Sequence, residues 1–335
     1  MLTLLSSRWA LPSSSPQQMH IPDGFLSVLV SIVLWAVSVI VIGIALRKTG
    51  KLLGERQVPL MGVLAAAIFA GQMLNFTVTG GTSGHLLGAA IATILLGPWP
   101  AVLVITSVVA VQALLFQDGG ILALGANIFN MAVVGVFVSY AIYTPLANLL
   151  KRQQWGLFVA GFLAAWTSIF VASLSAALQL AVSGTSPANI AIPAMGGIHA
   201  LIGIGEGLIT AGALAFVFAA RRDLLSAGDI GPASNRSILV VGGIIAVVLA
   251  VLSPLASSNP DGLEWVAEEH GFIDAAQEAA YSIIPDYVMP GVSDPALATI
   301  AAGILGVAIV FSVAYGVARA EKQTSVRQTA QEHQL

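Results

Sequence analysis

Long apolar stretches, separated by short polar segments, run through most of the chain. A helix needs roughly 17–25 residues to cross a lipid bilayer, and nine stretches approach or reach that length. We expect each of them to be helical, at about 25–46, 58–76, 82–97, 99–117, 122–149, 155–182, 197–220, 237–254 and 296–318. The third stretch is short for a full crossing. The pattern predicts an all-α fold, a polytopic membrane helix bundle with about seven transmembrane helices and a two-helix C-terminal unit.

The composition agrees with a membrane protein. Of the 335 residues, 57% are apolar and only 9% are charged, whereas soluble domains carry about 25% charged residues. The chain has no cysteine, which excludes disulfides, iron–sulfur clusters and thiolate zinc sites. Any metal site must therefore use histidine, carboxylate, methionine sulfur or backbone atoms.

The charged residues predict how the bundle is oriented. Apart from Arg8, every Lys and Arg lies within 47–56, 151–152, 221–236 or 319–327. Because basic residues favour cytoplasmic loops, nine crossings place the N-terminus outside the cell membrane and the C-terminus in the cytoplasm. The external side then includes an acidic loop, residues 255–295, which either concentrates cations or only stays soluble. It has no basic residue and eight carboxylates: Asp261, Glu264, Glu268, Glu269, Asp274, Glu278, Asp286 and Asp294.

The chain divides at its polar segments. We expect a leader over 1–18, a seven-helix metal-binding domain over 19–220, a cytoplasmic linker over 221–236, a two-helix unit with the acidic loop over 237–318, and a cytoplasmic tail over 319–335. Arg8 interrupts the apolar run of the leader, which makes it a poor signal-peptide core. Three possibilities stay open: Met19 is the true start, the leader is removed after Gln18, or it persists.

Met19 and His20 carry the most specific metal-binding chemistry in the sequence. A free amine on Met19 and the backbone nitrogen of His20 close a five-membered ring on one metal ion. The His20 Nδ1 atom closes a six-membered ring with the same backbone nitrogen. This amide must lose its proton, which Ni²⁺, Cu²⁺ and to a lesser degree Co²⁺ favour through their preference for tetragonal nitrogen donors. His85, in an uncharged glycine-rich loop, is the candidate for a fourth nitrogen. The alternative is that each histidine is an ordinary hydrogen-bonded surface residue.

Other polar residues interrupt the apolar bundle. Asn75, Asn127 and Asn130 are candidates to hydrogen-bond the ligating histidines, although interhelical hydrogen bonding explains them equally well. His199 and Glu206 lie seven residues apart and therefore on one helix face. An intramembrane carboxylate suggests a functional role, and structural pairing is the alternative for both residues.

Missing motifs narrow the function. The sequence has no GxxxxGK[ST] loop, so we expect no nucleotide to be bound by this chain. It also lacks the HExxH motif of zinc proteases and the GxSxG elbow of hydrolases, and we expect no nucleic-acid partner. The chain is therefore predicted to bind or transport rather than to catalyse a reaction.

Several runs resemble one known family. MHIPDGF over 19–25, GGTSGHLL over 80–87, GANIFN over 125–130 and HALIGIGEGLIT over 199–210 are similar to the CbiM/NikM substrate-binding components of energy-coupling factor (ECF) transporters for cobalt and nickel. NPDGLE over 259–264 and its flanking helices resemble the CbiN/NikN-type PDGLE component, here fused. The resemblance covers residues 19–318. It implies metal ligands at Met19, His20 and His85, and a retained leader would acylate the amine of Met19.

The resemblance implies an ATP-driven importer that captures Co²⁺ or Ni²⁺ as its transported substrate, for cobalamin or nickel-enzyme biosynthesis. The implied partners are a transmembrane coupling subunit, two ATPase subunits and membrane lipid. Two alternatives remain: an intramembrane metalloenzyme using His20, His85, His199 and Glu206, or a component of the same scaffold that binds an organic vitamin. Nitrogen donors accept both ions, and the affinity order favours nickel over cobalt only modestly.

Overall fold

The computed structural model describes residues 19–54, 57–150, 153–220, 224 and 235–332. The expected leader (1–18) and nearly all of the expected linker (221–236) lie outside the described residues. The segment expected to form a cytoplasmic tail continues the last helix, α11 (Pro295–Glu332), as far as Glu332.

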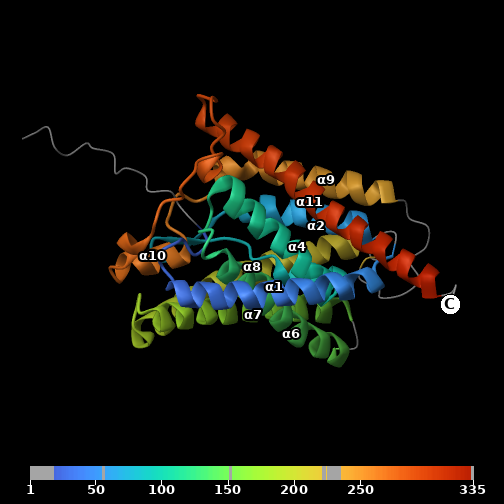
Figure 1. The fold of residues 1–335 in the computed structure, drawn as a ribbon, viewed down its shortest axis with the longest axis horizontal. Helices are drawn as coiled ribbons and strands as arrows, with labels where there is room; N and C mark the ends of the chain where they lie inside the picture. The colour runs from blue at the N-terminus through green and yellow to red at the C-terminus, as the bar shows by residue number, and fades with distance from the viewer. Residues whose placement is uncertain (1–18, 55–56, 151–152, 221–223, 225–234, 333–335) are drawn as a thin grey trace, which may run out of the picture.

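Long helices make up most of the described chain (Figure 1). Seven of the described helical segments are long and apolar enough to cross a membrane. They are α1 (Val28–Leu52), α4 with the π-helical η1 (Pro98–Phe116), α5 with the π-helical η2 and α6 (Leu124–Leu149), α7 (Gln154–Ser183), α8 (Ala188–Ala220), α9 (Asn235–Leu252) and α11. Two shorter helices, α2 (Gln57–Gln72) and α3 (Ala89–Leu96), complete the bundle. The predicted all-α polytopic membrane fold is confirmed.

The third apolar stretch differs from the helix expected over 82–97. Its first residues form the strand β2 (Thr82–Gly84), which pairs antiparallel with β1 (Phe76–Val78). The turn between the strands contains Gly80 and Gly81, whose φ angles of 88° and 83° suit glycine and break a helix. Only α3 remains helical, and its 8 residues span about 12 Å, well short of a bilayer core.

Small residues let the helices approach one another closely. On α8, Gly203 and Gly207 face the aromatic rings of Trp166 and Phe162 on α7, so that any Cβ there would lie within 3 Å of a ring atom. Small residues have the same role in other membrane bundles. The C-terminal helices α9 and α11 pack on α2 (Figure 1), and the C-terminal part of the chain is therefore built onto the rest of the bundle.

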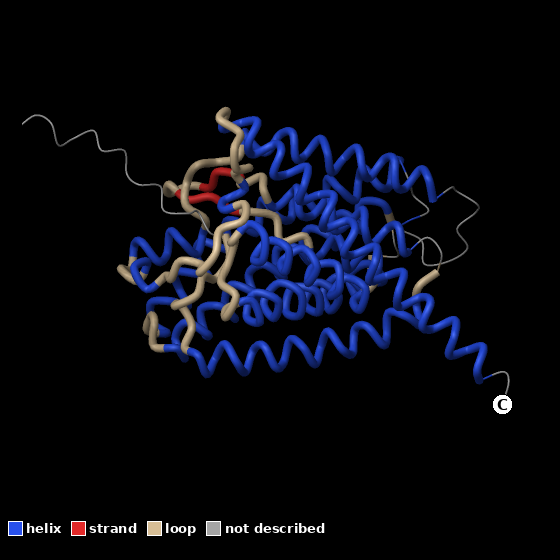
Figure 2. The backbone as a smooth tube through the Cα atoms, turned by 45° about the horizontal axis from the view of Figure 1, so that its top comes forward, coloured by secondary structure: helices blue, strands red, loops and turns tan. Residues whose placement is uncertain are grey.

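The strands and many of the connecting loops lie at one end of the bundle (Figure 2). The acidic loop, which includes the short helix α10 (Gly262–Glu269), is joined there to the first part of the chain by backbone hydrogen bonds. These bonds run from Gln277 N to Asp23 O, from Ser83 N to Pro260 O and from Ser257 N to Asn75 O, each 2.8 Å long. The acidic loop is thus an integral part of this end of the molecule.

Asp23 lies directly before the first apolar stretch, where an aspartate often caps a helix. The structure assigns it another role, because α1 begins at Val28 with Ser27 as its N-cap. The Asp23 carboxylate instead accepts hydrogen bonds from the backbone N–H groups of Ile121 and Ala123, at 3.1 and 2.9 Å. It therefore ties the segment around His20 to the loop that follows η1.

Gly125 on α5 provides a test of the close packing against α1. A Cβ atom at this position would lie 2.5 Å from the Cα atom of Trp35, whereas one at Gly43 on α1 would meet nothing within 4 Å. We expect Gly125→Ala to destabilise the protein by about 1–3 kcal/mol, the usual cost of overpacking against backbone. Thermal unfolding in detergent measures this effect. Equal melting temperatures for Gly125→Ala and the control Gly43→Ala would contradict it.

Candidate metal centre

The segment that contains Met19 and His20 is buried against the loop and helix start at residues 117–127. Met19 is 7% exposed and His20 is 3% exposed. Asn127 holds the next residue of the segment in a reciprocal pair of hydrogen bonds, because its Oδ1 accepts from Ile21 N and its Nδ2 donates to Ile21 O, both at 3.0 Å. Asn127, expected near a ring nitrogen, thus fixes the backbone beside His20.

Three nitrogen atoms of Met19 and His20 converge on one carboxylate oxygen. Asp118 Oδ1 lies 2.8 Å from Met19 N, 3.3 Å from His20 N and 3.0 Å from His20 Nδ1. These are the nitrogens that the sequence analysis assigned to one chelate. Asp118 lies just after η1, where Gln117 adopts a left-handed conformation with φ 56°. The fold therefore directs all three nitrogens at a common point.

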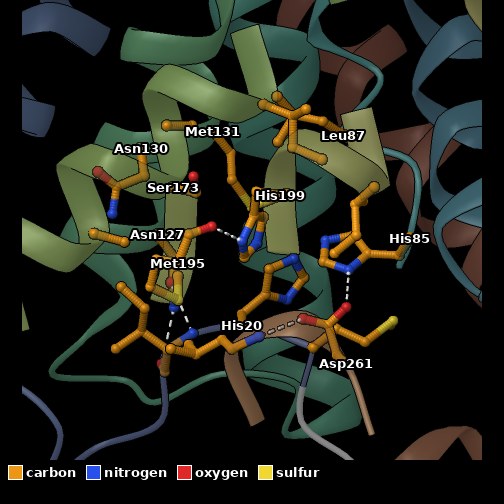
Figure 3. Close-up of a pocket in the computed structure, with 17 residues that line it drawn as sticks. His20, His85, Leu87, Asn127, Asn130, Met131, Ser173, Met195, His199 and Asp261 are labelled. Atoms are coloured by element: carbon orange, nitrogen blue, oxygen red, sulfur yellow. Dashed lines mark hydrogen bonds and ion pairs between the residues drawn. The ribbon is translucent and has the colours of Figure 1, made fainter. Parts of the chain in front are cut away.

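His85 lies beside His20, in the non-helical segment between β2 and α3. The two rings are 5.4 Å apart between centroids and meet edge-on, at 72°. His85 Nδ1 pairs with Asp261 Oδ1 at 3.0 Å (Figure 3). Because Nδ1 is engaged in this way, Nε2 is the ring nitrogen that remains to bind a ligand. Asp261 comes from the acidic loop, more than 170 residues further along the chain.

Glu206 holds the loop that carries His85. Its fully buried carboxylate accepts hydrogen bonds from Leu87 N at 2.7 Å and from Gly88 N at 3.0 Å. These amides precede α3, and the N-terminal N–H groups of a helix have no acceptor within the helix itself. In a membrane bundle, water does not replace such a partner. These hydrogen bonds fit the structural alternative for Glu206, in which its carboxylate pairs with buried polar groups.

The three histidines His20, His85 and His199 face one cavity of about 80 Å³ (Figure 3). His199 is fixed by its Nδ1 atom, which donates to Met195 O at 2.8 Å. Asn130 also lines the cavity and exchanges hydrogen bonds with Gln179.

Asn75, the third asparagine predicted to hydrogen-bond the histidines, does not line the cavity. Its backbone carbonyl accepts from Ser257 N. The structure thus brings Asn127 and Asn130 to the candidate site but leaves Asn75 on the connection to the acidic loop.

The pKa values of the carboxylates beside the histidines are lowered in spite of their burial. Burial alone would raise the pKa of the Asp118 carboxyl, but the His20 ring and the hydrogen bond from the Tyr287 hydroxyl lower this pKa below its ordinary value. The Asp261 pKa is lowered in the same way, with burial opposed by the neighbouring His85. Burial opposes protonation of His85, yet the Asp261 carboxylate raises the pKa of its ring. For Asp118 and Asp261, a neighbouring histidine therefore offsets the effect of burial.

Asp118 and Tyr287 were not predicted as site residues from the sequence. Asp118 follows an apolar stretch directly, within Gln117–Gly120, and this position at the end of a helix was the available signal. Tyr287 lies in the acidic loop without a recognisable pattern around it. Among the described residues, no three His, Cys, Asp or Glu side chains are placed to hold one metal ion. The nitrogens that do converge include two from the backbone.

The described helices form an apolar membrane bundle in which three imidazoles surround one cavity. Comparisons with known proteins identify its class. Residues 20–224 match the CbiM family, described as a cobalt uptake substrate-specific transmembrane region, and residues 236–323 match the PDGLE domain. The chain belongs to the CbiM family and carries a fused PDGLE domain, which confirms the resemblance noted in the sequence.

Individual relatives extend over both parts of the chain. One relative, from Archaeoglobus fulgidus, is named as a fused nickel transport protein, NikMN. It is 36% identical over 314 residues, which cover 90% of this chain and 98% of the relative. The fused nickel transport protein NikMN of Rhodobacter capsulatus is also 36% identical, over 82% of this chain and 84% of its own length. A crystal structure of a truncated transition metal transporter has a TM-score of 0.54 and 37% identity, covering 60% of this chain and 99% of that one.

These relatives are transport proteins and not enzymes. The chain is accordingly a component of cobalt or nickel transport, and the metalloenzyme alternative is set aside. The seven apolar helices make it a multi-pass membrane protein.

Glu206 offers a test of how the His85 loop is held. Glu206→Ala leaves the Leu87 and Gly88 amides buried without an acceptor, at a cost of about 1–3 kcal/mol each. We expect a clear fall in the thermal unfolding temperature in detergent. Thr210→Val is the matched control, because Thr210 lies one turn along α8, is buried and has no hydrogen-bond partner for its hydroxyl. Equal stability of the two variants would show that the carboxylate does not support the loop.

Proposed function

We propose that the protein is the substrate-specificity component of an ATP-driven ECF-type importer and captures Co²⁺ or Ni²⁺ at the external face of the cell membrane. The observation that carries this proposal is the convergence of Met19 N, His20 N and His20 Nδ1 on a single point beside the His85 ring. The imported ion serves cobalamin or nickel-enzyme biosynthesis. Membership in the CbiM family supports the choice of these two metals.

In the proposed site, the ion takes the place at which Asp118 Oδ1 now accepts from the three nitrogens. Met19 contributes its amine, His20 its backbone nitrogen and Nδ1, and His85 its Nε2 atom. The two nitrogens of His20 lose their protons when the ion binds, which favours metals that accept a tetragonal field of nitrogen donors. Little conformational entropy is lost, because the burial of Met19 and His20 and the Asn127 bonds already hold this segment.

The proposed orientation follows from the distribution of charge. The site and the acidic loop lie at one end of the bundle, whereas α1 ends and α9 begins at the other end (Figure 1). Arg47, Lys48 and Arg236 lie at that other end. Basic residues favour the cytoplasmic side, so the metal site faces outward and the C-terminus lies in the cytoplasm.

The proposed division of the chain follows the earlier expectation. A seven-helix metal-binding domain covers 19–220, and a two-helix unit with the acidic loop covers 237–318. A transmembrane coupling subunit and two ATPase subunits supply the energy on the cytoplasmic side, because the sequence has no phosphate-binding loop of its own. These partners are carried over from the family resemblance.

Substitution of the two ligating histidines tests the proposed site. We expect His20→Ala and His85→Ala each to weaken Ni²⁺ and Co²⁺ binding to the purified full-length protein by roughly 100-fold or more, which is ~2.7 kcal/mol. Equilibrium dialysis with elemental analysis measures the binding. His270→Ala is the control, since His270 is exposed in the acidic loop. Unchanged affinity in both variants would refute the proposal, and an organic ligand that copurifies without metal would favour the vitamin-binding alternative.

The amine of Met19 gives a separate prediction. Protein loaded with Ni²⁺ is expected to begin at Met19, because acylation of this nitrogen by a preceding residue removes its ability to complete the chelate. Intact mass spectrometry of the metal-bound fraction identifies the first residue. A form with a protease site placed before Met19 should gain tight binding only after cleavage. Equally tight capture by protein that retains residues 1–18 would overturn the proposed coordination.

A further inference from the structure

Two residues of the acidic loop reach the two candidate metal-binding histidines. Asp261 contacts His85 directly, and Tyr287 contacts Asp118, which in turn contacts His20. Both contacts are buried, with Asp261 at 4% and Tyr287 at 8% exposure. Neither residue belongs to the part of the chain that matches the CbiM family.

Asp261 is held firmly in position beside His85. Its second oxygen accepts from Leu263 N at 3.4 Å as the N-cap of α10. The residues before Asp261 are also joined to the strand before His85. Ser83 N donates to Pro260 O and Ser83 Oγ donates to Asn259 O, both at 2.8 Å. The loop that carries Asp261 and the strand that leads to His85 are therefore joined directly by hydrogen bonds.

Tyr287 is positioned by a second set of contacts. Its hydroxyl donates to Asp118 Oδ2 at 2.6 Å, and its ring stacks on Phe116 with centroids 4.7 Å apart and planes at 15°. Asp286 and Tyr287 both have positive φ angles, 54° and 58°, a conformation that is unfavourable for non-glycine residues and persists only where surrounding contacts enforce it. The fold thus accepts backbone strain at the residue that contacts Asp118.

These contacts match the requirements of a buried metal site. A histidine that binds a metal usually donates its other ring N–H to a carboxylate, which fixes the tautomer and the direction of the ring. The Asp261 contact leaves His85 Nε2 as the ligating atom. When an ion binds His20, Asp118 Oδ1 loses its two His20 donors, and the Tyr287 hydroxyl still holds Oδ2. The Asp118 carboxylate then stays next to the ion and balances its charge in a buried environment.

We propose that Asp261 and Tyr287 of the acidic loop are positioning residues of the metal site, Asp261 by orienting the His85 ring and Tyr287 by retaining Asp118 beside the bound ion. This inference rests on the proposed coordination by Met19, His20 and His85. It makes the PDGLE domain a structural part of the metal site that lies in the CbiM region.

The test uses the purified full-length protein, Ni²⁺ as the probe, and two readouts: the binding affinity and the X-ray absorption spectrum of the bound nickel. Asp261→Ala should weaken binding 10- to 100-fold and reduce the imidazole scattering around nickel. Asp261→Asn should recover part of the affinity, because its amide oxygen can still accept from His85 Nδ1–H, although the amide nitrogen cannot replace the oxygen that accepts from Leu263 N. Tyr287→Phe, which keeps the stacked ring, should weaken binding about tenfold.

Two controls match these variants. Tyr281→Phe removes a hydroxyl of the same loop that donates to Ala113 O and not to Asp118. Glu278→Gln removes an exposed carboxylate of the loop. Both controls should bind Ni²⁺ like the unmodified protein.

The outcomes separate this inference from the proposed function. Native affinity in both Asp261→Ala and Tyr287→Phe overturns it, and so does weaker binding by Asp261→Ala with an unchanged nickel spectrum. If Asp261→Ala does not fold, the comparison of Tyr287→Phe with Tyr281→Phe decides, and equal affinity overturns the inference. Failure of the proposed function has a different signature, which is native affinity in His20→Ala and His85→Ala.

Discussion

The Asp118 carboxylate is the interaction on which the arrangement of the site depends. One of its oxygens accepts from three nitrogens of Met19 and His20, and the other accepts from Tyr287. Asp118 thereby joins Met19, at the beginning of the described chain, to Tyr287 in the acidic loop, more than 260 residues later. A buried carboxylate is stable only with several such partners, so these segments are required to meet at Asp118.

The same physical requirement explains the other polar residues at this end of the bundle. The chain here is non-helical, and its backbone groups need partners that a membrane environment does not supply. Asp23 accepts from two amides after η1, Asn127 pairs with Ile21, and Glu206 accepts from the two amides before α3. Each side chain replaces hydrogen bonds that a continuous helix would have made within itself. The polar side chains around the site therefore serve to satisfy its irregular backbone.

The sequence predicted the helices well because hydropathy is a local property. It also singled out His20 and His85, whose rings lie 5.4 Å apart in the structure, although their role as metal ligands stays a prediction. It did not predict the hairpin of β1 and β2, since two glycines and a contact with Pro260 decide that conformation. Asp118 and Tyr287 were missed for a related reason. Their importance comes from contacts between distant segments, which leave no periodic signal along the chain.

The shortness of α3 has an electrical consequence. In the proposed orientation, His85 is separated from the cytoplasmic turn at Gly97 by this helix and a few non-helical residues, and the helix spans only about 12 Å of a ~30 Å hydrocarbon core. An ion held there has already crossed part of the transmembrane voltage. Full passage is worth ~2.3 kcal/mol per elementary charge at 100 mV, and a divalent ion gains twice that amount. Because the proposed coordination also releases two protons from His20, the net charge moved to this depth is small, and the membrane potential has little effect on occupation of the site.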